Sequence, residues 1–198
     1  LTMVTAIRPG PPPSTSSQKF KDETEEIYQI TKKLTREQLR IADFWADGLR
    51  TYTPPGHWNY IAATDFAQQN FSEARWARNM ALLNMASIMD AGVVCWDTKN
   101  FYYGPRPMQV DPRIKTGIGL PNFPGYISGH STFSGAAATV LGYILPSRAQ
   151  AYDDMAKEAS VSRMYGAIHF RTDCEVGLTT GNKVGAYSVA RGHIDGAE

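Results

Sequence analysis

The sequence has little that would mark a membrane protein or a nucleic-acid-binding protein. Its 20 basic and 19 acidic residues leave a formal net charge of +1, and the basic residues form no tract. We therefore expect no nucleic-acid partner and no binding to an anionic membrane surface. The most apolar stretch, Met80 to Trp96, is interrupted by Asn84 and Asp90 and is too short to span a bilayer. We expect it to be a buried helix and predict no transmembrane segment.

Cysteine is also scarce, which excludes a disulfide-rich scaffold. The two cysteines, Cys95 and Cys174, lie far apart in the chain, so one disulfide and two buried free thiols are both compatible with the sequence. The cysteines and the four histidines show none of the spacings that are typical of a metal site built from these residues.

Strand-like patterns are few, and the apolar positions mostly follow a helical period. A chain of 198 residues is long enough for one domain with a substantial core. Because no alternation of strands and helices is present, we predict an all-α fold, a helical bundle. We place an extended segment rich in Pro and Ser at residues 1–19 and a single helical domain at residues 20–198, to which the site described below gives its function.

Local signals divide the helical part. A capping box at Thr35 to Gln38 predicts a helix through Leu49, and the Pro-Pro-Gly sequence after it predicts a turn over residues 51–57. Residues 100–129 are rich in Pro and Gly and predict a long loop, a kind of segment that is often functional. We predict further helices over residues 21–34, 58–70, 72–94, 130–145, 153–168 and 175–191.

Three blocks of cationic residues and histidines stand out between positions 96 and 173. Their members are Lys99 and Arg106 in the first block, Ser128, Gly129 and His130 in the second, and Arg163, His169 and Asp173 in the third. Arginine presents a planar fork to two oxygens, whereas lysine is a mobile point charge. Three cations and two imidazoles together are suited to holding a tetrahedral oxyanion and reacting with it. The sequence therefore predicts one oxyanion pocket.

Two local arguments assign roles within these blocks. Ser128 and Gly129 directly precede a helix of small residues, where backbone N–H groups and the helix N-terminus favour an anion. On one continuous helix, Ser162, His169 and Asp173 would share a stripe, so Asp173 would lie near His169. A carboxylate on one imidazole nitrogen fixes the tautomer and frees the other nitrogen as a nucleophile or ligand.

The remaining histidines and tryptophans receive ordinary interpretations. His57 and His193 lie outside the pattern of blocks, and we interpret them as structural residues. We predict that Trp45, Trp58 and Trp76 are core aromatic residues.

The three blocks together resemble the signature shared by the phosphatidic acid phosphatase type 2 superfamily and the vanadium-dependent haloperoxidases. One departure is Ile127, where the family usually has proline before Ser-Gly-His. The resemblance implies the helical bundle of the acid phosphatase and vanadium haloperoxidase type, and it favours a secreted or periplasmic location. Because haloperoxidases are longer, it also implies that an N-terminal helical portion is missing; a homo-oligomer is compatible with it.

Three residues favour the haloperoxidase branch of this resemblance. Trp96 matches a haloperoxidase tryptophan, Phe123 resembles a chloroperoxidase phenylalanine, and Arg171 completes a His-aromatic-Arg sequence. The resemblance then implies hydrogen peroxide and halide as substrates and a halide pocket lined by Trp96 and Phe123. It implies vanadate ligated by His169, with His130 as acid and base and Lys99 polarising the peroxide. The vanadate oxygens would be bound by Lys99, Arg106, Arg163, Ser128 and Gly129.

Two alternatives remain open from the sequence. In an acid phosphatase of the same superfamily, no vanadate is needed. His169 would attack a phosphomonoester, Asp173 would orient it, and His130 would protonate the leaving oxygen. In the second alternative, from another class, the chain is an inactive helical protein that binds oxyanions.

Overall fold

The structure, a computed structural model, describes residues 4–195 and is all-α over that range. Two 3₁₀ turns, Val4–Ala6 and Pro146–Arg148, and a π-helical turn, Asn84–Ile88, accompany the α-helices. The α-helices are α1 (Gln18–Lys33), α2 (Arg36–Phe44), α3 (Thr53–Ala67), α4 (Glu73–Leu83), α5 (Met89–Tyr102), α6 (Pro107–Val110), α7 (Gly129–Ile144), α8 (Ala149–Tyr165) and α9 (Arg171–Asp195). Among the described helices, none combines the length and apolar character that crossing a membrane requires.

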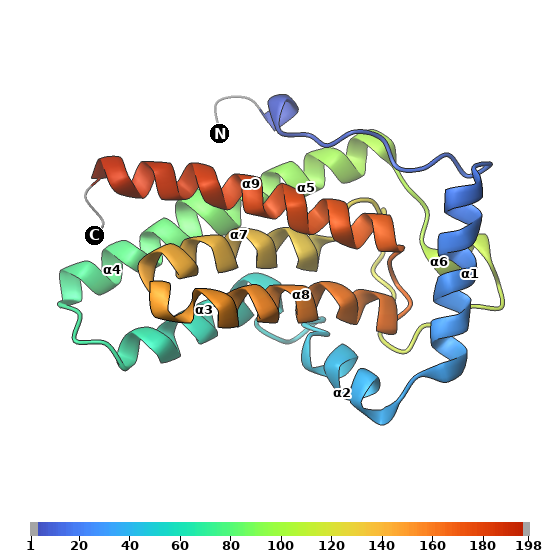
Figure 1. Cartoon of the computed structure of the whole chain (residues 1–198). Coiled ribbons are helices and arrows are strands. Elements are labelled where there is room, and N and C mark those ends of the chain that lie inside the picture. The colour runs from blue at the N-terminus through green and yellow to red at the C-terminus, as the bar shows by residue number, and fades with distance from the viewer. Residues whose placement is uncertain (1–3, 196–198) are drawn as a thin grey trace.

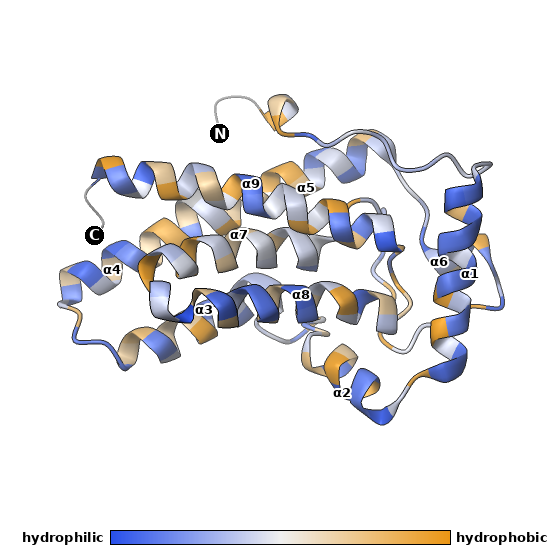
Figure 2. Ribbon diagram, in the orientation of Figure 1, coloured by the Kyte–Doolittle hydropathy of each residue, from blue (hydrophilic) through white to orange (hydrophobic). Residues whose placement is uncertain are grey.

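Helix α7 is the centre of the bundle. It packs most extensively against α9 and α8, and also contacts α5 and α3 (Figure 1). Most of its residues are buried, although many are Ser, Thr, Gly or Ala. Such small side chains let neighbouring helices come close, so most of α7 from Ser131 onward is buried. By contrast, α1 crosses one end of the bundle and is largely hydrophilic (Figure 2).

Glycines hold α7 and α9 in direct backbone contact. A Cβ added at Gly181 of α9 would lie 2.2 Å from the carbonyl oxygen of Thr132 in α7. In the opposite direction, a Cβ at Gly135 would lie 2.6 Å from the carbonyl oxygen of Leu178. A Cβ at Gly177 would likewise meet the carbonyl oxygen of Ser128 at 2.8 Å. This close approach brings the N-terminal ends of the two helices together, where two of the three blocks lie.

The capping box is confirmed, but two predicted boundaries are wrong. Thr35 and Gln38 cap α2 as expected, although this helix ends at Phe44 rather than near Leu49. The Pro-Pro-Gly sequence does not form a separate turn, because it lies in the first turn of α3. Proline is tolerated there, since its missing N–H would have no partner inside the helix.

The apolar helix also extends further than predicted, and the loop after it is shorter. The apolar helix continues through the π-helical turn to Tyr102, and Tyr103 in the left-handed conformation ends it. The expected loop is therefore shorter, and α6 interrupts it. The two cysteines are buried free thiols. Trp45 and Trp58 are core residues, but Trp76 is 42% exposed, so that prediction was wrong.

The segment before α1 is tightly held on the surface, not a free linker. The Arg8 guanidinium donates to both carboxylate oxygens of Asp97, at 2.6 and 2.8 Å. The hydroxyl of Tyr102 donates to the Pro9 carbonyl, and that of Tyr126 donates to the Gly10 carbonyl. We call residues 8–17 the N-terminal strap.

Candidate active site

The side chains of Lys99 and Arg106 are buried on either side of the short connection between α5 and α6. Lys99 lies in the last turn of α5, and its Nζ donates to the carbonyl oxygens of Pro124 and Gly125, both at 2.8 Å. Arg106 is the N-cap residue of α6. Its Nη1 donates to the Ile168 carbonyl at 2.7 Å. Both cations are almost fully buried, and neither has a carboxylate partner within salt-bridge distance among the described residues.

We expected Asp173 to lie near His169, and the two side chains are in contact. The helix boundaries that bring them together differ from the one continuous helix of that argument. Helix α8 ends at Tyr165 and α9 begins at Arg171, so the single helix assumed for the stripe does not exist. Asp173 lies in the first turn of α9, where its Oδ2 accepts from the Phe170 backbone N–H at 3.2 Å. The same oxygen lies 3.0 Å from His169 Nδ1. Ser162 does not join them, because its hydroxyl donates to the Ala159 carbonyl.

Hydrogen bonding determines the tautomer of His169. Its Nε2 lies 2.9 Å from Nη1 of Arg106, and a guanidinium can only donate. Nε2 therefore carries the lone pair, while Nδ1 carries the proton and donates to Asp173. The buried imidazole thus presents a nucleophilic, metal-binding nitrogen toward a cation.

Two buried guanidinium nitrogens in this region have no hydrogen-bond partner within residues 4–195. Arg163 uses Nε on the Ser162 hydroxyl and Nη2 on the Ala42 carbonyl, which leaves Nη1 unpaired. Arg106 similarly leaves Nη2 unpaired. A buried donor without an acceptor is costly, and a charged one more so. An anion bound between these side chains would satisfy both donors.

The Ser128-Gly129-His130 block forms the N-terminus of α7. Ser128 is the N-cap residue, and its Oγ accepts from both the backbone N–H and the hydroxyl of Ser131. Its own hydroxyl proton therefore remains available for a ligand. The Ser128 backbone N–H donates to the Asp173 carbonyl at 2.9 Å, which ties this end of α7 to α9. A methyl group at Gly129 would meet no atom of the protein closer than 3.9 Å.

Two functional candidates were missed by the sequence interpretation. Asp47, in the loop between α2 and α3, places Oδ2 3.8 Å from the buried Nε2 of His130. The same carboxylate lies 3.1 Å from Nδ1 of His57, which had been interpreted as an ordinary structural histidine. No local motif joins these three residues, because they come from separate parts of the chain. His193, in contrast, packs against Tyr143 at the far end of α9.

Burial and nearby charges shift the pKa values of the residues in this cluster. Desolvation lowers the pKa of Lys99 to about 8 and that of Arg106 and Arg163 to about 10. Burial, followed by the nearby cations, holds the pKa of His169 well below its usual value. Burial raises the pKa of Asp173 to about 7 against the pull of Lys99. This pattern is that of several cations buried close together, a kind of cluster that is frequent at functional sites.

Trp96 and Phe123 lie together on the more open side of this cluster. Their ring centroids are 5.3 Å apart, and each residue is 42% exposed. Lys99 Nζ and the Arg106 guanidinium carbon lie 5.3 and 5.2 Å from the Phe123 ring centroid. Arg171 takes no part, because it pairs with Glu26 and Glu175 on the surface.

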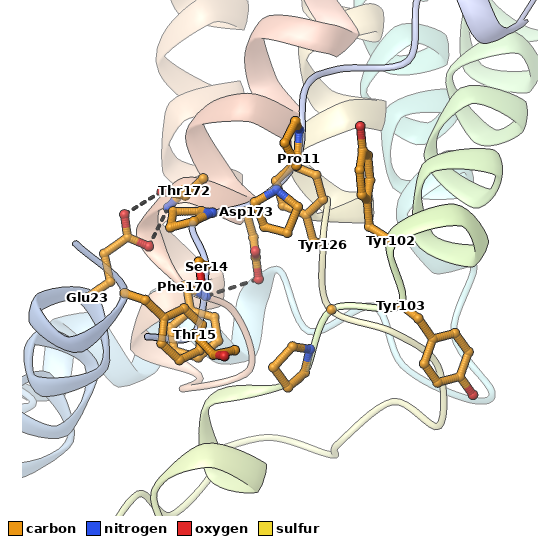
Figure 3. Close-up of a pocket in the computed structure, with 15 residues that line it drawn as sticks. Pro11, Ser14, Thr15, Glu23, Tyr102, Tyr103, Tyr126, Phe170, Thr172 and Asp173 are labelled. Atoms are coloured by element: carbon orange, nitrogen blue, oxygen red, sulfur yellow. Dashed lines mark hydrogen bonds between the residues drawn. The ribbon is translucent and has the colours of Figure 1, made fainter. Parts of the chain in front are cut away.

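A cavity of about 470 Å³ is lined in part by Asp173. Pro11 and its neighbours in the N-terminal strap line it, together with Tyr102, Tyr126 and Phe170 (Figure 3). Glu23 of α1 borders the same space and accepts from the backbone N–H and hydroxyl of Thr172, at the start of α9. The strap and α1 therefore cover the segment that carries the His169 and Asp173 pair.

The lowered pKa of Lys99 leads to a prediction about pH. We expect sulfate affinity to fall as pH rises from about 6.5 to about 9.5, because Lys99 loses its charge and Asp173 gains one in this range. Sulfate keeps a constant charge there, so the change reports on the protein. Calorimetric titration measures the affinity. In Lys99→Arg the cation persists, and the loss between pH 8 and pH 9 should become much smaller. An affinity independent of pH in the unmodified protein would contradict the prediction.

The comparisons with known proteins agree with this geometry. A sequence model of the PAP2 superfamily matches residues 80–191, a range that contains all three blocks. A search of curated proteins finds no match. Among solved structures, a bacterial vanadium-dependent iodoperoxidase is 30% identical with a TM-score of 0.86, covering 96% of this chain and 54% of its own.

Two more distant structures show the fold alone. An apo-type bacterial vanadium-dependent chloroperoxidase has a TM-score of 0.76 at 15% identity, covering 98% of this chain and 54% of its own. A transmembrane PAP2-type phosphatidylglycerolphosphate phosphatase from Bacillus subtilis has a TM-score of 0.61 at 13% identity, covering 98% and 94%. The chain thus spans about half the length of the two peroxidase structures. With three blocks of cations and histidines gathered around one helix N-terminus, and a family match over more than half its length, the chain belongs to the PAP2 superfamily.

Proposed function

We propose that this chain is a vanadate-dependent haloperoxidase that oxidises halide with hydrogen peroxide to hypohalous acid. The observation that carries the proposal is the pair of buried, unpartnered donors, Arg106 Nη2 and Arg163 Nη1, in the cluster around His169. The likeness to an iodoperoxidase along 96% of the chain supports this branch of the superfamily. The aromatic pair of Trp96 and Phe123, beside Lys99, supports it further.

The residues present fit vanadate, a tetrahedral oxyanion with a metal centre. His169 would be the metal ligand through Nε2, since Nδ1–H is held by Asp173. The oxygens would be held by Lys99, Arg106, Arg163, the Ser128 hydroxyl and the Gly129 backbone N–H. When bound, vanadate supplies a Lewis-acidic centre that activates hydrogen peroxide toward halide.

The other residues of the site would contribute protons, charge and an apolar surface. His130 lies at the N-terminus of α7 with its Nε2 near Asp47, so it would take up and return a proton. Lys99 brings a positive charge that a buried site makes more effective. Trp96 and Phe123 would form an apolar wall where halide approaches.

A histidine-nucleophile acid phosphatase is the second candidate, and the His169 tautomer supports it. The lone pair on Nε2 and the Nδ1–H bond to Asp173 are what attack on a phosphomonoester needs. In that reaction Nε2 would bond to phosphorus as the ester oxygen leaves, and His130 would give that oxygen a proton. Both candidates use the same cations, because phosphate and vanadate have nearly the same shape.

A paired assay separates these candidates. With vanadate, peroxide and bromide, we expect halogenation of a phenolic dye, loss of this activity when vanadate is removed, and competition by phosphate. Some phosphatase activity without vanadate is compatible with the proposal. Brisk phosphomonoester hydrolysis that vanadate only inhibits, without halide oxidation at any pH, would instead assign the chain as a phosphatase. Failure to bind either anion would favour an inactive protein.

A further inference from the structure

We propose that His57 is a positioning residue that holds the Asp47 carboxylate against His130. The inference rests on the proposed function in one respect, the role of His130 as acid and base. It concerns a histidine that lies outside residues 80–191, the part of the chain that the superfamily model matches.

The three side chains form a row that is buried at His57 and Asp47 and partly exposed at His130. Nδ1 of His57 lies 3.1 Å from both oxygens of Asp47, and Oδ2 of Asp47 lies 3.8 Å from Nε2 of His130. The side chains of His57 and Asp47 are 3% and 4% exposed. Because a carboxylate only accepts, His57 carries its proton on Nδ1 and donates it to Asp47. Among the described residues His130 Nε2 makes no hydrogen bond of normal geometry, although the backbone of Trp45 and Ala46 also lies against this imidazole.

Aromatic neighbours hold the His57 ring in place, in addition to its hydrogen bond with Asp47. Its ring stacks on Trp45 at 4.4 Å, while Phe44 and Tyr52 meet it edge-on at 4.9 and 5.2 Å. Trp58, the next residue, donates from Nε1 to the Ser134 hydroxyl of α7 at 2.8 Å. Helix α3 is thereby fixed on the helix that carries His130.

Asp47, by contrast, comes from a loop and needs such support. Its backbone has a φ of 45°, in the left-handed region that non-glycine residues seldom adopt. Residues held in this region persist where the surrounding structure fixes them, and they are frequent at functional sites. Without the His57 N–H, the carboxylate would have no donor within hydrogen-bond distance in the described structure.

The chemical consequence concerns the tautomer of His130. A carboxylate facing Nε2 favours the tautomer with a proton on Nε2, which leaves Nδ1 as the base. After Nδ1 accepts a proton, the same carboxylate stabilises the imidazolium. The separation of 3.8 Å is longer than a hydrogen bond, and such contacts tighten when the reacting complex forms. Orientation by His57 would therefore affect turnover and not anion affinity.

Two substitutions separate positioning from packing. His57→Phe keeps the aromatic stack but removes the donor, whereas His57→Asn keeps a donor near the position of Nδ1. In the vanadate-loaded protein we expect kcat for halide oxidation to fall about 10- to 100-fold in His57→Phe, with vanadate affinity unchanged. His57→Asn should recover most of this loss. In an Asp47→Asn background, His57→Phe should have no further effect, because the two residues act as one unit.

If His57→Phe lowers kcat by the same factor in the unmodified protein and in the Asp47→Asn background, His57 has a packing role and the inference is overturned. Equal losses in His57→Phe and His57→Asn would also overturn it. If the unmodified protein shows no enzymatic activity, the proposed function fails, and the inference is then tested by the ¹⁵N shifts of the His130 ring without vanadate. A predominantly Nε2–H tautomer that becomes mixed in His57→Phe would support it; the same tautomer populations in both proteins would overturn it.

Discussion

Replacing His169 with alanine is expected to abolish tight vanadate binding, whereas replacing His130 with alanine should leave vanadate bound and stop turnover. His169 presents the Nε2 lone pair among the buried cations, so its removal takes away the metal ligand. His130 is placed for proton transfer beside Asp47, so its loss should lower kcat by roughly 10²–10⁴-fold. One variant loses affinity, and the other loses rate.

Equilibrium titration with vanadate and a halide-oxidation assay measure these two effects separately. His193→Ala is the matched control, because His193 lies on α9 at its far end, where it contacts Tyr143. This control should retain both affinity and rate. Equal loss of vanadate affinity in His169→Ala and His130→Ala would show that the two roles have been misassigned.

Replacing Gly181 with alanine is expected to destabilise the protein by about 3 kcal/mol or more. The new Cβ would lie 2.2 Å from the backbone oxygen of Thr132 and 3.0 Å from the backbone nitrogen of Ala136. These are backbone atoms of the central helix, so neither can move aside as a flexible side chain would. The contact between α7 and α9 would have to widen, and the His130 end of α7 would shift relative to Asp173.

Urea unfolding measures this effect as a lower midpoint. Gly119→Ala is the control, because a Cβ there meets nothing within 4 Å, and its midpoint should remain close to that of the unmodified protein. If Gly181→Ala unfolds at the same urea concentration as the control, the direct backbone contact of the two helices is not what fixes the site.

The sequence predicted features that depend on neighbouring residues and missed those that depend on tertiary contact. The capping box at Thr35 and the start of α7 after Ser128 were visible because both are local patterns. The Pro-Pro-Gly sequence before His57 was misread, because proline ends a helix in the interior but is favoured in the first turn.

The candidate site shows the same division. The three blocks could be recognised from residue types and spacings, yet the stripe argument held only for one continuous helix through His169, and α8 ends before that residue. The actual partner geometry comes from a cap at the start of α9, with Asp173 binding the Phe170 backbone. Asp47 was not predicted at all, since only the folded loop brings it to His130, which is 83 positions away.

A crystal structure of the protein with orthovanadate tests the central claim most directly. The account predicts vanadium bonded to His169 Nε2, with its oxygens accepting from the unpartnered nitrogens of Arg106 and Arg163 and from Lys99. Vanadate found elsewhere on the surface, with His169 Nε2 still bonded to Arg106 and the two guanidinium nitrogens still unpaired, would contradict it.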